Sequence, residues 1–122
     1  MQKQILARPA TPEMKAAHKA TDEAVMAVTT DRSHKAQAPE PLRPERRWPN
    51  PAELVKHFKE ARDAHIAYIE KTPDDLRGHF GPFGPLGPID AYQWILMLSS
   101  HTERHTAQIN EVKADANFPK NQ

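Results

Sequence analysis

Two histidines near the end of the chain are the residues best suited to chemistry. His101 and His105 are four positions apart, so on a helix their side chains lie one above the other. Neutral imidazole is the commonest nitrogen ligand of divalent transition metals, and one ion would satisfy both rings. Gln108, one turn further along, could support a ligand as a hydrogen-bond partner. The spacing therefore predicts either a divalent-metal site at His101 and His105 or a pair of hydrogen-bonded histidines in a core or cleft.

A metal site needs three or four ligands, so further donors must come from elsewhere. The metalloprotease helix motif is excluded, because Thr102 rather than Glu follows His101. His65 lies on the apolar stripe of a predicted helix and is the best placed of the other five histidines. A single histidine in such a stripe is, however, more often an ordinary core residue.

The glycine-rich segment 78–88 is the other segment that invites a chemical interpretation. It contains all four glycines, and three Gly-Pro pairs follow one another within it. A phosphate-binding loop needs backbone N–H donors, and each proline removes one. The segment is therefore predicted to be an irregular loop without a phosphate site.

The elements that must position these residues are predicted from capping signals and apolar periodicity. The strongest start signals are Asn50-Pro51 before one long helix and Asp90 with Gln93 before another. The predicted helices cover residues 51–72, residues 90–113 and weaker stretches within 12–30, either continuous or restarting at Thr21. No strand pattern appears, so the predicted class is all-α.

Composition limits the function further. The 122 residues have room for one small domain, taken as 1–122, with a proline-rich connector at 31–50. The absence of Cys excludes disulfides, cysteine-ligated zinc and thiol nucleophiles. Seventeen basic residues nearly balance 16 acidic ones, and no apolar segment is long enough to span a membrane. We therefore expect a soluble cytoplasmic protein with neither nucleic acid nor membrane as partner.

A family resemblance is carried mainly by DAYQWILMLSSHTERHTAQINEVKA, residues 90–114, which resembles the final helix of the DinB-like superfamily. Also similar are HF-x3-R-x5-Y within 56–68, DLRGH at 75–79 and LG at 86–87, and the resemblance covers residues 20–119. It implies a four-helix bundle that binds nickel or zinc through three histidines. Two of these correspond to His101 and His105.

The start of the chain departs from the family pattern. Residues 2–12 resemble a segment that follows the family's first histidine ligand, so we expect an incomplete bundle without its first helix and that ligand. His18 lies too far along to replace it. Four alternatives remain: His65, a water molecule or a partner chain supplies the third ligand, or the metal is lost.

Two functions follow as hypotheses. In the first, the chain is a metal-binding domain acting on small molecules, because the superfamily includes transferases that use low-molecular-weight thiols. A metal with an open position would lower the pKa of such a thiol. In the second, it is a non-catalytic helical module that completes its core by forming a homodimer or larger oligomer. Whether the chain is an enzyme is left open.

Overall fold

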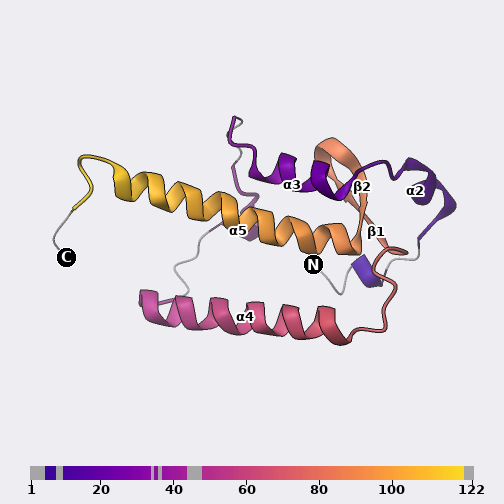
Figure 1. Cartoon of the computed structure of the whole chain (residues 1–122), viewed down its shortest axis with the longest axis horizontal. Coiled ribbons are helices and arrows are strands. Elements are labelled where there is room, and N and C mark those ends of the chain that lie inside the picture. The colour runs from indigo at the N-terminus through magenta and orange to yellow at the C-terminus, as the bar shows by residue number, and fades with distance from the viewer. Residues whose placement is uncertain (1–4, 8–9, 34, 36, 44–47, 120–122) are drawn as a thin grey trace. The chain divides into compact units, whose positions relative to one another are not determined.

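The fold is mostly helical, with one small sheet. A computed structural model describes residues 5–7, 10–33, 35, 37–43 and 48–119 (Figure 1). Its helices are α2 (Pro12–Ala17), α3 (Asp22–Thr30), α4 (Pro51–Lys71) and α5 (Ala91–Ala114), its 3-10 turns η1 (Glu40–Leu42) and η2 (Gly84–Leu86), and its strands β1 (Phe80–Phe83) and β2 (Gly87–Asp90). The chain divides into two compact units, Met1–His34 with Asp75–Gln122 and, separately, Lys35–Asp74.

The helix starts predicted at Thr21, Asn50 and Asp90 are confirmed. Thr11, Thr21 and Asn50 each accept a hydrogen bond from a backbone N–H in the first turn of the following helix. Asp90 caps α5 and forms a complete capping box with Gln93. The stretch within 12–30 is two helices, because α2 ends at Ala17 and Thr21 starts α3.

The prediction of an irregular loop at 78–88, and with it the strictly all-α class, is wrong. β1 and β2 form an antiparallel hairpin in which Phe80 pairs with Asp90 and Phe83 with Gly87. Pro82 lies opposite Pro88. In a two-stranded ribbon every second residue turns its N–H away from the partner strand, so opposed prolines are tolerated there.

Gly87 is the position in the hairpin whose backbone conformation requires glycine. Its φ of 74° and ψ of −148° lie in a region that is essentially restricted to glycine. A Cβ at Gly87 would meet no atom within 4 Å, and the same is true of Gly84. Any cost of a Cβ at Gly87 is therefore backbone strain and not a clash.

We expect Gly87→Ala to lower the free energy of unfolding by about 1–3 kcal/mol, the usual cost of such backbone strain. Gly84→Ala is the matched control, because Gly84 has open space but no positive φ. Urea unfolding followed by circular dichroism measures both variants. Equal effects at the two positions would contradict the assignment of strain to Gly87.

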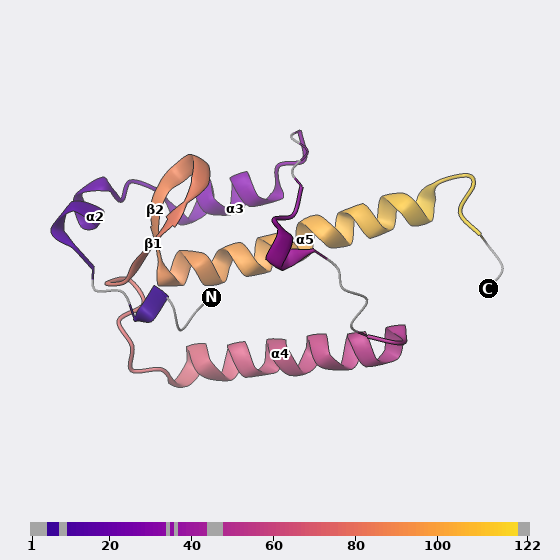
Figure 2. The ribbon, with the colours of Figure 1, turned by 180° about the vertical axis from the view of Figure 1, so that it is seen from behind.

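The core of the first unit forms where α3, β2 and α5 meet. Val25 of α3 and Ile89 of β2 are fully buried and form a cluster with Met97 of α5. Phe83 and Trp94 pack against this cluster, and their rings meet edge to face at 5.6 Å. Figures 1 and 2 show α3 alongside the first half of α5. Burial of each such side chain contributes about 1.5–3 kcal/mol.

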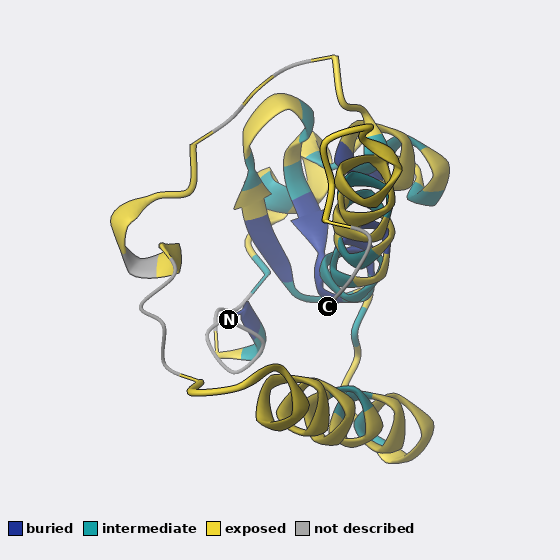
Figure 3. Cartoon of the chain, turned by 90° about the vertical axis from the view of Figure 1, so that its left-hand side faces the viewer, coloured by how far each residue is buried: buried dark blue, intermediate teal, exposed yellow. Residues whose placement is uncertain are grey.

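The second unit consists of the described part of the connector and α4. Trp48 stacks on His57 of α4 with ring centroids 4.1 Å apart. No residue of α4 is buried, as the colouring of Figure 3 shows. The large apolar side chains exposed on it are Leu54, Val55, Phe58, Ile66 and Ile69. Within the described residues, no helix combines the length and apolar character required to cross a membrane.

Candidate metal centre

The two histidines lie in the middle of α5, on the stripe formed by Trp94, Leu98, His101, His105, Gln108 and Val112. The capping box at Asp90 starts the helix. Met97 and Ser100, on a neighbouring face of α5, are buried. Both histidines remain exposed to solvent. Neither histidine is buried in the core of the first unit, and the hydrogen bond between them is confirmed.

The two rings converge on each other. Nε2 of His101 lies 2.9 Å from Nε2 of His105, and the rings meet edge to face at 4.4 Å. On its other side, Nδ1 of His105 lies 2.6 Å from Oε1 of Gln108. Gln108 thus occupies the supporting position predicted from its spacing.

This arrangement determines the protonation of both rings when they are neutral. An amide oxygen only accepts, so Nδ1 of His105 carries its proton and donates to Gln108. Nε2 of His105 then has a lone pair and accepts from Nε2–H of His101. His105 is therefore already in the tautomer that presents Nε2 to a metal, and His101 reaches it by moving one proton to Nδ1.

The electrostatic surroundings favour neutral imidazole at His101. Desolvation by neighbouring protein atoms, together with the nearby His105 and the Arg104 guanidinium, lowers the pKa of His101 below its ordinary value. Metal ions bind the neutral ring, so this pKa shift reduces competition from protons. Arg104 itself donates to the carbonyl oxygen of Asp31.

The described residues supply no third ligand beside the pair. Among them, no group of three or more His, Cys, Asp or Glu side chains is arranged to hold a metal ion. His65 belongs to α4 in the other unit, and its Nδ1 is buried without a hydrogen-bond partner in the described structure. This ring nitrogen of His65 therefore interacts with no other polar group among the described residues.

A second polar cluster, which the sequence did not predict, surrounds Arg77. Its guanidinium donates to both carboxylate oxygens of Asp22, at 2.7 and 2.8 Å, and to Oδ2 of Asp90 at 2.9 Å. It also lies over the ring of Tyr92 at 4.1 Å. The hydrogen bonds from Arg77 lower the pKa of Asp22, and the two carboxylates raise the pKa of Arg77. Arg77 thereby joins the start of α3 to the cap of α5.

Gln93 extends this cluster through its buried side chain. Its Oε1 accepts from the backbone N–H of Asp90 and lies 2.8 Å from Nε2 of His18, which must therefore donate. Its Nε2 donates to the carbonyl oxygen of Ala20 and to Asp22. His18 thus has a structural partner. Only the Asp90–Gln93 capping box gave a sequence signal. The other partners are 13 positions apart for Arg77 and Asp90 and 55 to 75 positions apart for the rest.

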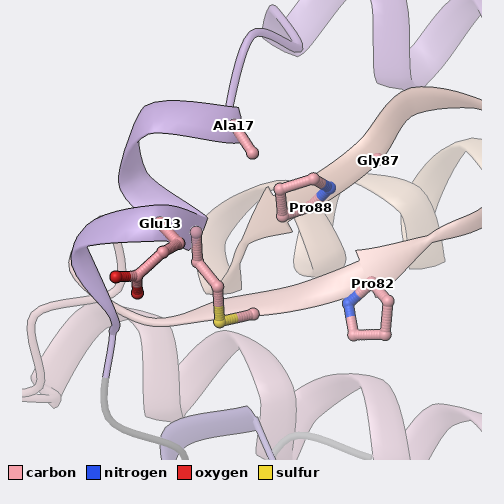
Figure 4. A pocket seen from close by; sticks show the side chains of 6 residues that line it. Glu13, Ala17, Pro82, Gly87 and Pro88 are labelled. Carbon is pink, nitrogen blue, oxygen red and sulfur yellow. The ribbon is translucent and has the colours of Figure 1, made fainter.

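A shallow pocket of about 370 Å³ lies between α2 and the hairpin (Figure 4). Met14, Ala17, Pro82 and Pro88 give it an apolar lining, and Glu13 is its charged residue. Glu13 lies in the first turn of α2 and is exposed. This lining offers no convergent set of polar groups of the kind that orients a substrate.

Comparison with known protein families gives a match that covers most of the chain. A family model described as the DinB superfamily matches residues 7–109, which include both histidines, Arg77 and Gln93. The chain belongs to the DinB superfamily. No curated protein and no solved structure shows a significant match.

Proposed function

We propose that this DinB-superfamily domain binds a divalent transition metal, nickel or zinc, through Nε2 of His101 and His105. The observation that carries the proposal is the convergence of these two nitrogens at 2.9 Å. Two nitrogens of a tetrahedral zinc site with bonds of about 2.0–2.1 Å are separated by about 3.3 Å, so a small side-chain rotation would admit an ion. Gln108 supports the proposal as the acceptor that orients His105.

The donor chemistry of the pair fits such an ion, but the number of donors is smaller than a site requires. Both rings are neutral nitrogen donors, which suit nickel and zinc. A complete site requires at least three protein ligands or an equivalent set with water. We propose that additional donors complete it, from His65, water or a partner chain.

The chemistry proposed for the bound metal is activation of a small thiol. A divalent ion with an open position lowers the pKa of a bound thiol and generates thiolate at neutral pH. In this chain, His101 and His105 would hold the ion and Gln108 would keep His105 in the binding tautomer. The superfamily's relation to thiol-using transferases supports small thiols as the substrate class.

We also propose that the helices of this chain form a DinB-type bundle. Its inward faces would include the apolar stripe of α4, from Leu54 and Phe58 to Ile69, which is exposed. An exposed stripe of this length needs a covering surface.

We expect untagged protein to bind nickel or zinc, with the affinity reduced at least 100-fold in His101→Ala, because one ligand remains. Gln108→Leu should weaken binding by about 10-fold, since it removes the partner that orients His105. Isothermal titration calorimetry after treatment with chelator measures both effects. His57→Ala provides a control histidine, exposed and remote in sequence. An unchanged affinity in His101→Ala would contradict the proposal.

A second candidate function is that of a non-catalytic module that completes its core by self-association. It is favoured by the exposed apolar residues of α4. In that case the oligomer forms in the presence of chelator and is unaffected by His101→Ala. Sedimentation velocity with and without EDTA distinguishes this candidate from the first.

A further inference from the structure

We draw no further inference here: the strongest candidate, the shallow apolar pocket between α2 and the β1–β2 hairpin, is lined by Met14, Ala17, Pro82 and Pro88 with Glu13 as its charged residue, and nothing in the described part of the chain shows what covers it.

Discussion

Replacing Arg77 with methionine is expected to lower the free energy of unfolding by about 2–3 kcal/mol, although the Arg77 side chain is half exposed. The cost arises at its partner Asp90, whose carboxylate is 2% exposed and would lose its cationic partner. The bidentate contact with Asp22 is lost as well. Urea unfolding monitored by tryptophan fluorescence measures the effect.

The pH dependence of this effect follows from Asp22. Its folded-state pKa is lowered below the ordinary value, mainly by the hydrogen bonds from Arg77. The stabilisation from this pair is therefore present above the unfolded-state pKa of about 4 and is lost as the pH falls through the lower folded-state value. The difference between the original chain and Arg77→Met should accordingly shrink below about pH 4.

Two further variants test the assignment. Arg77→Lys retains the charge but loses the planar fork, so it should recover only part of the stability. Arg62→Met removes an arginine that lies over the Phe58 ring on α4, and it should cost less than about 1 kcal/mol. A loss in Arg62→Met as large as that in Arg77→Met would refute a special role for Arg77.

Gln93→Leu is expected to destabilise the protein by about 3 kcal/mol, although the two side chains have similar volumes. Gln93 is 1% exposed, and its amide serves Asp90, Ala20, Asp22 and His18. Leucine would leave these buried and half-buried groups without Gln93 as a partner, and each unsatisfied group costs about 1–3 kcal/mol before relaxation. Thermal unfolding by circular dichroism measures the loss.

Gln108→Leu is the matched control, since it makes the same replacement on the same helix. The side chain of Gln108 is only half-buried and bonds to His105. We expect a change of less than about 1 kcal/mol in stability. Similar losses at positions 93 and 108 would show that leucine itself, and not the buried network, is responsible.

The sequence predicted features that depend on neighbours a few positions apart. The helix caps at Asn50 and Asp90 and the hydrogen bond between His101 and His105 all follow from spacings of three or four residues. The supporting contact from Gln108 is of the same local kind. These features are confirmed because a helix brings such residues together whatever the rest of the fold does.

The features that the sequence did not predict depend on distant partners. Arg77 and Asp22 are 55 positions apart in the sequence, and the residues around neither of them predict the contact. The hairpin was missed because its Gly-Pro pairs have low strand propensity. Burial of Phe80 and Ile89 in the first unit outweighs that propensity.

Asp90 is at once the last residue of β2, the cap of α5 and an acceptor for Arg77, so no spare residue separates the hairpin from the helix. A single residue inserted between Asp90 and His101 would turn the rest of α5 by about 100° relative to its cap. The histidine pair would then face a different direction, even though every residue type was retained. Variation in chain length should therefore be tolerated in the connector and excluded from the ten residues between Asp90 and His101.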